Sequence, residues 1–350
     1  MESVKRILIT RTDRIGDVLL STPAIKALRK AFPQSHIAVM VRPYARDIVL
    51  GNPYLDEVII YDKYGAQRSF WKTIKFARDL RARRFDLALV LHPTRRQHLI
   101  TFLAGIKKRV GFNLKLGFLL TDKLEHKKQE GKRHELEYTL DIVRSLGIKA
   151  QDKDLFMPIR KDSEMHIERL LQAENINKMV ALHPGASCAS KLWPLERFAR
   201  VADALIERFN VKIVVLSSKD DIARGKRLLS LIHHACIDAC GMTTVSELAS
   251  LLRKCSLLIC NDSGPMHIAA ALKMPVIAIF GRAQAGLSPR RWGPRGKDNV
   301  VLHKDVGCSE CLAHNCQKGF ACLSAVSVQE VVEAAVRAYS NTPLYIQLTA

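Results

Sequence analysis

One polar turn carries residue types that suit a bound phosphate. The stretch 261–267 (Asn-Asp-Ser-Gly-Pro-Met-His) lies between an apolar run typical of a buried strand and an alanine-rich segment typical of a helix. Asp262 or Ser263 can cap that helix, Pro265 fits its first turn, and Gly264 lets the backbone approach a ligand closely. An open helix N-terminus offers unpaired N–H groups and the positive end of the helix dipole. A capped helix end without a ligand is the simpler structural alternative.

Three further polar turns lie between strand-like and helix-like segments. They are 11–17 (Arg-Thr-Asp-Arg-Ile-Gly-Asp), 183–187 (His-Pro-Gly-Ala-Ser) and 191–194 (Lys-Leu-Trp-Pro). In parallel α/β sheets the loops at the carboxyl ends of the strands form the ligand sites, so we expect these turns to line them. The first turn lacks the G-x-G-x-x-G fingerprint of dinucleotide-binding domains.

Alternating strands and helices must position these turns. The segments that read as strands are 6–10, 36–41, 58–61, 86–91, 179–182, 211–216, 257–260 and 275–280, with 236–240 as a weak strand or loop. The segments that read as helices are 18–31, 44–50, 71–83, 99–104, 135–146, 163–173, 195–209, 221–233, 245–253, 268–272 and 328–339. Such alternation predicts an α/β fold with parallel sheets.

The length of 350 residues favours two domains. We predict a Rossmann-like domain over 1–155, a second over 156–326, and a C-terminal helix and tail over 327–350 that could pack back on the first domain. The segment 147–160 reads as the linker. Parallel sheets facing each other across a cleft would bring the polar turns of both domains together.

The formal net charge of +21 implies anionic partners, which include nucleic acid, an acidic membrane surface and phosphorylated small molecules. Aromatic residues are not interleaved with the basic ones, so a single-strand nucleic-acid platform is poorly supported. No apolar run reaches the ~18 residues of a membrane span. Without a secretory signal, we expect a cytoplasmic protein whose nine cysteines are reduced.

The segment 107–133 is strongly basic, with nine Lys or Arg residues and three acids. Three glycines interrupt it, which predicts a basic, partly mobile loop. This charge would suit a polyanionic substrate, although a solvated basic surface is the equally simple alternative.

Four clustered cysteines invite a metal hypothesis: Cys308, Cys311, Cys316 and Cys322. Four thiolates can hold a structural zinc ion, but the second half of the cluster lacks a matching C-x-x-C. A disulfide or redox pair and packed free thiols are the alternatives.

The four polar turns, in this order and spacing, resemble the motifs of the bacterial ADP-heptose:lipopolysaccharide heptosyltransferases, glycosyltransferase family 9. The resemblance covers almost the whole chain. It implies a GT-B fold and metal-independent transfer of L-glycero-D-manno-heptose to the inner core of lipopolysaccharide, with inversion at the anomeric carbon and no cofactor beyond the ADP-sugar substrate.

The resemblance also implies roles for the aspartates of the first turn. Inverting transfer needs one base to take the proton of the attacking hydroxyl, and the base of the family falls on Asp17. The structural alternative for Asp17 is the N-cap of the following helix. Asp13 is the rival base, and it could instead bind the acceptor or orient Arg14.

The leaving nucleoside diphosphate needs its growing negative charge stabilised. Lys191 matches the phosphate-binding lysine of the family, and Asp262 an acid that lines the sugar site. The other residues expected at the donor are Ser187, Asp221 (for the ribose hydroxyls), Ser263, Gly264 and His267, although a core position is the better interpretation of His267.

The expected acceptor is the anionic lipopolysaccharide core, and its charges should meet Arg14, Lys107, Lys108, Arg109 and Arg133. We further expect a monomer that attaches to the inner membrane surface by its charge and binds no nucleic acid. A transferase for another nucleotide sugar or acceptor, a nucleotide-linked oxidoreductase and a nucleic-acid-binding module are the alternatives.

Overall fold

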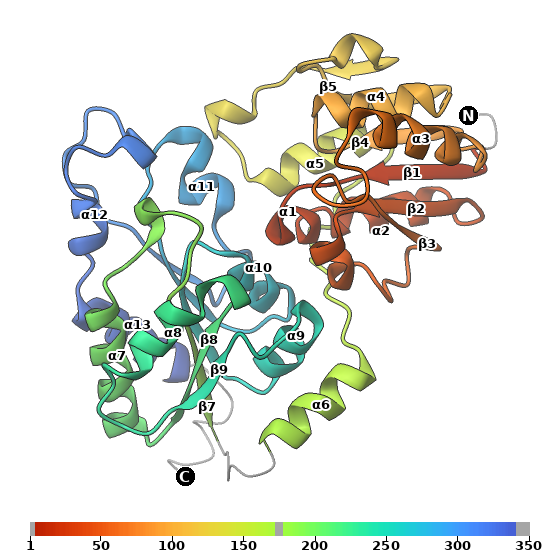
Figure 1. Ribbon diagram of the computed structural model, residues 1–350. Coiled ribbons are helices and arrows are strands. Elements are labelled where there is room, and N and C mark those ends of the chain that lie inside the picture. The colour runs from red at the N-terminus through yellow and green to blue at the C-terminus, as the bar shows by residue number, and fades with distance from the viewer. Residues whose placement is uncertain (1–3, 172–177, 341–350) are drawn as a thin grey trace. The chain divides into compact units, whose positions relative to one another are not determined.

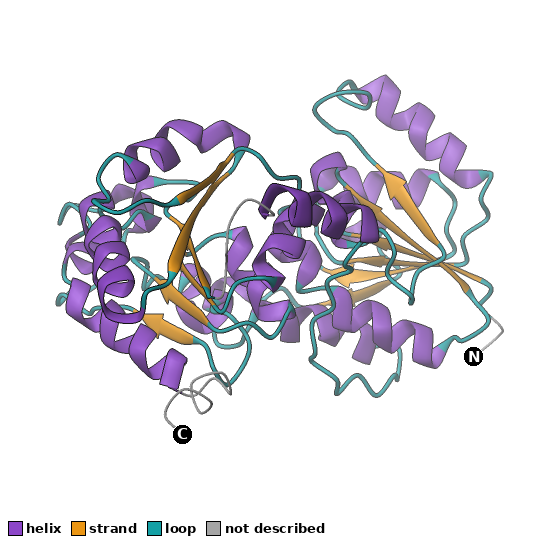
Figure 2. Cartoon of the chain, turned by 90° about the horizontal axis from the view of Figure 1, so that it is seen from below, coloured by secondary structure: helices purple, strands orange, loops and turns teal. Residues whose placement is uncertain are grey.

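The computed structural model describes residues 4–171 and 178–340 and divides between Pro158 and Ile159 into two units (Figure 1). This division falls three residues after the boundary expected from the sequence. Each unit contains a six-stranded parallel sheet with helices on both of its faces (Figure 2). An α/β fold with parallel sheets is therefore confirmed.

The first unit contains a sheet of strand order β3-β2-β1-β4-β5-β6. Its strands are β1 (Arg6–Thr10), β2 (His36–Val41), β3 (Glu57–Ile60), β4 (Leu87–Val90), β5 (Lys108–Phe112) and β6 (Asp122–Leu124). The inner strands are mostly apolar because helices cover both faces of the sheet. The strand order reverses between β1 and β4, and in sheets of this kind the loops after the two strands at the reversal form the ligand site.

Five helices and a 3-10 turn surround this sheet. They are α1 (Ile15–Leu19), α2 (Thr22–Ala31), α3 (Phe70–Arg81), α4 (Arg95–Leu103), α5 (Glu135–Arg144) and the 3-10 turn η1 (Pro43–Ile48). Helix α2 packs with α5, and α3 packs with α4. The single helix expected over 18–31 is wrong, because the chain breaks after Leu19 and restarts with Pro23 in the first turn of α2.

The prediction of a loop over 107–133 is also wrong. This segment forms β5 and β6, with 3-10 turns at Gly117–Leu119 and Lys128–Glu130. Lys108 and Arg109 begin β5 with exposed or half-exposed side chains, whereas Val110 and Phe112 are buried. The apolar residues of β5 therefore fix a strand that the surrounding charges hid.

The second unit repeats the same plan with the strand order β12-β11-β10-β7-β8-β9. Its strands are β7 (Met179–His183), β8 (Lys212–Ser217), β9 (Ile237–Cys240), β10 (Leu257–Asn261), β11 (Val276–Ile279) and β12 (Val300–Leu302). The last of these was not expected. The order reverses between β7 and β10, and the phosphate-type turn follows β10.

The helices of the second unit are α6 (Lys161–Leu171), α7 (Leu195–Phe209), α8 (Ile222–Leu229), α9 (Val245–Arg253), α10 (Gly264–Ala271), α11 (Pro289–Trp292), α12 (Ala321–Ser324) and α13 (Val328–Ser340). Residues 172 and 173, expected to end the first of these helices, lie outside the described residues. Helix α9 packs with α6 and α10, and helix α7 packs with α8 and α13. Within the described residues, no helix is both long and apolar enough to cross a bilayer.

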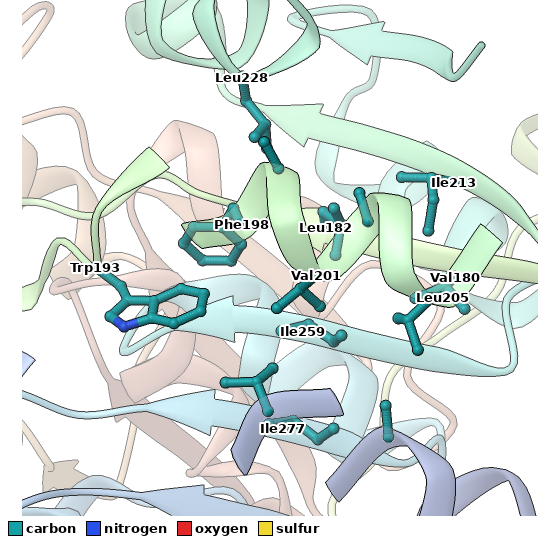
Figure 3. Close-up of a cluster of buried hydrophobic side chains, with 14 of the residues drawn as sticks. Val180, Leu182, Trp193, Phe198, Val201, Leu205, Ile213, Leu228, Ile259 and Ile277 are labelled. Carbon is teal, nitrogen blue, oxygen red and sulfur yellow. The ribbon is translucent and has the colours of Figure 1, made fainter. Parts of the chain in front are cut away.

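The core of the second unit lies between its sheet and α7. Trp193 and Phe198 meet edge to face with ring centroids 5.0 Å apart, and they pack on Ile259 and Leu182 of the sheet (Figure 3). The C-terminal helix α13 adds Val331, Ala334 and Ala335 to the same cluster. This helix was expected to pack back on the first domain, but its apolar residues are buried in the second. The tail expected over 341–350 lies outside the described residues.

Candidate functional site

In the first unit, polar residues gather where the strand order reverses. The turn after β1 begins with Arg11, and the loop after β4 begins with Leu91 and His92. The Arg11 Nη1 donates to the Leu91 carbonyl oxygen at 3.0 Å, and His92 Nδ1 lies 3.9 Å from Asp13 Oδ2. Parallel pairing of β1 with β4 thus brings together two loops that are 80 residues apart in the sequence.

Arg11 is the centre of this cluster, with a side chain that is only 2% exposed. Its Nη2 donates to Asp17 Oδ1 at 2.8 Å and to Glu135 Oε1 at 3.2 Å, and its Nε lies 3.0 Å from Asp13 Oδ1. Lys128 Nζ donates to the same Glu135 oxygen at 2.7 Å. Two cations therefore hold three carboxylates that would otherwise repel one another.

The cluster shifts the acidity of its members. Burial raises the pKa of Asp17, and the charge of Asp13 raises it further, so that it reaches about 6 in spite of Arg11. Burial also raises the pKa of Asp13. Burial and the charge of Arg11 lower the pKa of His92 to about 3, so this imidazole is neutral near pH 7. Asp17 is thus a carboxylate that can accept a proton near neutral pH.

Asp17 does not cap a helix. It lies inside α1, whose N-cap position is taken by Arg14, and its side chain is 12% exposed. The N-cap alternative for Asp17 is therefore wrong. Asp13 pairs with Arg11, so the expectation that it might orient Arg14 is replaced by this ion pair. Arg14 is exposed at the start of α1.

The structure does not bring the expected acceptor residues together with Asp17. Lys107 and Lys108 lie at the amino end of β5, and Lys108 is level with Ile7 of β1 across β4. That level is about 10 Å from the carboxyl end of β1, at ~3.3 Å per residue. Arg109 donates instead to the carbonyl oxygens of Leu119 and Ile106.

Arg133, the last expected acceptor residue, is held by Asp141 of α5 and lies over the ring of Tyr138 at 4.9 Å. Two other cations, Lys63 and Lys115, influence the site. The charges of Lys63 and Lys115 lower the pKa of His92, which places both side chains near the carboxyl edge of the sheet. The lysines that follow β3 and β5, rather than those at the start of β5, are therefore close enough to influence His92.

The second unit forms its own polar cluster at the reversal between β7 and β10. Lys191 Nζ lies 3.0 Å from Asp262 Oδ2, and Arg282 Nη2 donates to the same oxygen at 2.6 Å. All three residues are buried. Burial lowers the pKa of Lys191, and the charge of Arg282 adds to this effect against the opposing charge of Asp262. Two cations share one carboxylate, so the cluster keeps a formal positive charge that suits an anion.

The turn before α10 is open rather than capped. Ser263 occupies the N-cap position, but its hydroxyl makes no capping bond to α10 and lies 3.2 Å from His183 Nδ1. Gly264 is the first residue of α10. Burial lowers the pKa of His183 to about 4, so this imidazole is neutral near pH 7. Ser263 is therefore at the predicted N-cap position, but its side chain does not cap α10, and the first N–H groups of the helix keep their binding capacity.

The side chain of Asn261 holds the loop after β7 in place. This side chain accepts from the Trp193 backbone N–H at 3.1 Å and donates to the Pro184 carbonyl oxygen at 2.7 Å. Arg224 of α8 donates to the same Pro184 oxygen at 2.9 Å. These bonds tie the segment that carries Lys191 to the end of β10.

The remaining expected donor residues lie around this loop. A side chain at Gly185 would meet Asp221 Oδ2 at 2.6 Å and His183 Cε1 at 3.2 Å, so Asp221 lies directly against the loop. Burial raises the pKa of Asp221. Ser187 is exposed on the same loop, and His267 is buried within α10, as its core interpretation required.

An apolar surface adjoins Asp221. Met242 follows β9 and is 52% exposed, and Ile222, which begins α8, is 38% exposed. Ile222 lies against Gly241, whose N–H donates to the Ser217 carbonyl oxygen at 3.0 Å. Exposed apolar side chains beside a carboxylate at a strand end suit a flat heterocycle with an attached sugar.

A family model described as "Glycosyltransferase family 9 (heptosyltransferase)" matches residues 73–321, which is more than half of the chain. The chain belongs to glycosyltransferase family 9.

Members of this family are similar to the chain along most of its length. Lipopolysaccharide heptosyltransferase 2 of Escherichia coli (strain K12) is 25% identical over 296 residues, which cover 81% of this chain and 85% of that protein. The crystal structure of the glycosyl transferase family 9 protein from Veillonella parvula DSM 2008 is 27% identical, with a TM-score of 0.88 and coverage of 98% and 99%. The structure of E. coli ADP-heptose lps heptosyltransferase II is 23% identical, with a TM-score of 0.80 and coverage of 95% and 98%.

Family membership decides the class of protein. The enzyme is a glycosyltransferase with the two Rossmann-like units of the GT-B class, so the oxidoreductase alternative is wrong. This glycosyltransferase does not gather the four clustered cysteines into a metal site. Among the described residues, no group of three or more His, Cys, Asp or Glu side chains is arranged to hold a metal ion. All four thiols are free, and Cys322 donates to the Gly281 carbonyl oxygen at 2.7 Å.

Several residues of the two polar clusters were not predicted from the sequence, among them Arg282, Glu135 and Lys128. Arg282 follows the carboxyl end of β11, so the rule that polar residues after strands line the site could have found it. Glu135 and Lys128 carry no such signal. Lys128 lies in the basic segment 107–133 and Glu135 lies at the start of α5. Only the folded chain brings them to Arg11.

Proposed function

We propose that the enzyme moves L-glycero-D-manno-heptose from ADP-heptose to the inner core of lipopolysaccharide, by an inverting mechanism that needs no metal ion. One observation carries this proposal. Asp17 is a nearly buried carboxylate, held by Arg11, whose pKa is raised to about 6. The similarity to lipopolysaccharide heptosyltransferase 2 and to the ADP-heptose lps heptosyltransferase II supports the choice of donor and acceptor.

The transfer step uses Asp17 as the general base. The hydroxyl oxygen of the acceptor attacks the anomeric carbon of heptose from the face opposite to the ADP group, and its proton moves to Asp17. The bond between the anomeric carbon and the phosphate oxygen breaks, and its electron pair leaves with ADP. Arg11 keeps the carboxylate oriented through its bond to Oδ1.

The donor diphosphate binds in the second unit. Lys191, Arg282 and the open N-terminus of α10 supply positive charge for the leaving phosphate. In this arrangement Asp262 orients the two cations and Asp221 accepts hydrogen bonds from the ribose. The adenine ring lies on the apolar surface of Met242 and Ile222.

The acceptor and the site of action follow from charge. The lipopolysaccharide core carries phosphate and carboxylate groups, which the basic side chains of the first unit attract. We infer a monomer in the cytoplasm that works as a peripheral protein on the inner membrane.

The first test is calorimetric binding of ADP, UDP and GDP in the presence of a chelator. We expect a preference for ADP, and we expect Lys191→Ala to weaken it while Lys161→Ala, an exposed lysine of α6, leaves it unchanged. Preference for UDP or GDP would still agree with a glycosyltransferase but would contradict ADP-heptose as the donor. Binding that needs a divalent cation would contradict the metal-free mechanism.

The second test removes the base. Asp17→Asn should retain ADP binding and lose transfer by about 10²- to 10⁴-fold, which is the usual contribution of a general base. The anomeric configuration of the wild-type product, read by NMR, reports inversion or retention. Near-normal turnover in the variant would transfer the role to Asp13.

A further inference from the structure

An exposed aromatic segment precedes and begins α3. Its side chains Tyr64, Phe70 and Trp71 are 65%, 56% and 76% exposed, and all three lie within eight residues. We propose that this interfacial segment, residues 63–78, inserts its aromatic rings into the headgroup region of an anionic lipid bilayer. The bilayer is the partner because the segment combines large amphipathic rings with cations on one face.

Trp71 does not belong to the core face of α3, and Phe70, three residues before Thr73, begins the helix with a side chain that is still 56% exposed. That face consists of Thr73, Ala77 and Leu80, which are buried. At 3.6 residues per turn, Trp71 lies two residues and about 200° away from Thr73, on the opposite side of the helix. The Phe70 and Trp71 rings contact each other edge to face, with centroids 5.7 Å apart.

Positive charges share the outer face with Trp71. Lys75 and Arg78 follow Trp71 by four and seven residues, so they project on the same side of α3. Residues 63–84 contain eight Lys or Arg and one Asp, and the net charge opposes an apolar protein partner but complements lipid phosphates. Tryptophan between cations is typical of a segment that lies at the level of the headgroups.

The segment is held in place rather than free to move. Arg96, in the first turn of α4, donates to the carbonyl oxygens of Arg68 at 2.8 Å and of Gln67 at 3.3 Å. Ser69 caps α3 by accepting from the Lys72 backbone N–H at 3.2 Å. The rings are therefore presented by a fixed helix start in the described unit, where Figure 1 shows α3 beside α4.

The position of the segment relates it to catalysis. It follows β3 at the carboxyl edge of the sheet, the edge that also carries Asp17, and the charge of its Lys63 reaches His92. Insertion would therefore bring the edge with the base to a lipid-linked acceptor. The link between this membrane contact and catalysis rests on the proposed function, whereas the membrane contact itself does not.

The experiment measures co-sedimentation of the full chain with phosphatidylglycerol vesicles and with phosphatidylcholine vesicles, at low and at high salt. We expect wild-type binding to anionic vesicles with a fraction that survives high salt. Phe70→Ser with Trp71→Ser should remove that fraction and lower binding by about 10- to 100-fold, because the buried apolar area is lost. Lys75→Gln with Arg78→Gln should lower only the salt-sensitive part.

Two matched controls lie elsewhere on the same unit. Phe118→Ser removes a ring that is 68% exposed in the 3-10 turn after β5, and Lys107→Gln with Lys108→Gln removes charges at the amino edge of the sheet. Neither should change binding by more than about twofold if the segment 63–78 is the contact. Equal losses in all variants would overturn the assignment in favour of diffuse electrostatic attraction.

Fluorescence gives an independent readout. Trp193 is buried and Trp292 is half-buried, so Trp71 dominates any change at the surface. A blue shift and quenching by brominated lipids should occur in the wild type and vanish in Trp71→Phe, which keeps an apolar ring and should still sediment with vesicles. An unshifted spectrum on bound vesicles would overturn the insertion.

Two further measurements distinguish membrane insertion from self-association and from the proposed function. If Phe70→Ser with Trp71→Ser converts a dimer to a monomer in analytical ultracentrifugation, the surface binds a second copy and the lipid proposal is wrong. Transfer to a water-soluble core oligosaccharide should be equal in wild type and in this double variant. Absent transfer in both, with vesicle binding intact, would overturn the proposed function alone.

Discussion

At the scale of the residue, the acidity of Asp17 depends on its neighbours. Arg11 bonds Asp17 and Glu135 through one nitrogen, so the guanidinium charge is divided between two carboxylates. Asp13 adds a third negative charge. Burial and these charges outweigh the help of Arg11, and the pKa of Asp17 is raised to about 6 instead of lowered as in a simple ion pair.

This acidity predicts the pH dependence of transfer. A general base works only when deprotonated, and a raised pKa moves its protonation closer to neutral pH. We expect kcat/KM to be constant above pH 7 and to fall about tenfold per pH unit below about 6. A rate profile with saturating donor checks this, and an unchanged rate down to pH 4.5 would contradict it.

A second prediction concerns Glu135. Glu135→Gln removes a negative charge, so that Arg11 pairs with Asp13 and Asp17 alone. The pKa of Asp17 should therefore fall, and the acidic limb of the pH–rate profile should move to lower pH. The variant should also lose about 3–5 kcal/mol of stability, because it breaks a buried pair with Lys128. The control is Glu137→Gln: Glu137 lies on the same helix as Glu135 but pairs with Arg144 and Lys153, so its loss should not move the acidic limb of the rate profile. A shift to higher pH would show that Glu135 does not raise the pKa of Asp17.

At the scale of the element, the turns after β7 and β10 work because their backbones pass close to carboxylates and cations. Gly185 is the clearest example, because the position of its missing Cβ is already limited by Asp221 and His183. A side chain at this position would have to displace Asp221 and crowd His183. The sequence showed the glycine, and the fold shows why it is needed.

Gly185→Ala should therefore weaken donor binding. The new methyl group would displace Asp221 or shift the loop, so we expect a loss of ADP affinity of about tenfold, with little change in thermal stability because the loop carries no core residue. Calorimetric titration and a thermal melt check both parts. Unchanged ADP affinity would mean that ADP does not contact this loop.

At the scale of the whole molecule, the chain consists of two units with the same strand order and separate cores. The proposed base, Asp17, belongs to the first unit and the proposed donor site to the second. Units with their own cores can unfold separately.

Scanning calorimetry should consequently show two transitions. ADP at about 100 times its Kd should stabilise the second unit by about 2.7 kcal/mol and leave the first transition unmoved. Variants assign the transitions: Leu205→Ala should lower the one that ADP raises, and Ile100→Ala the other, since these residues are buried in different units. A single transition that ADP shifts as a whole would contradict separate unfolding.

The sequence by itself determined the alternation of strands and helices, the parallel sheets and the polar turns. These features follow from local periodicity and turn chemistry, so β1 and β2 and the helices α7 and α9 coincide with their predicted bounds. The turns that carry Asp17, Lys191 and the stretch before α10 follow strands, as the sequence predicted. Local patterns also identified the resemblance to family 9.

Only the tertiary structure decided which side chains meet. Glu135 reaches Arg11 across 124 residues, and Arg282 joins Lys191 at Asp262. Lys108 was expected at the acceptor, but it begins its strand and lies at the opposite edge. Strand order and register determine the edge to which a residue belongs, and they result from the packing of the whole sheet, which no local stretch of sequence encodes.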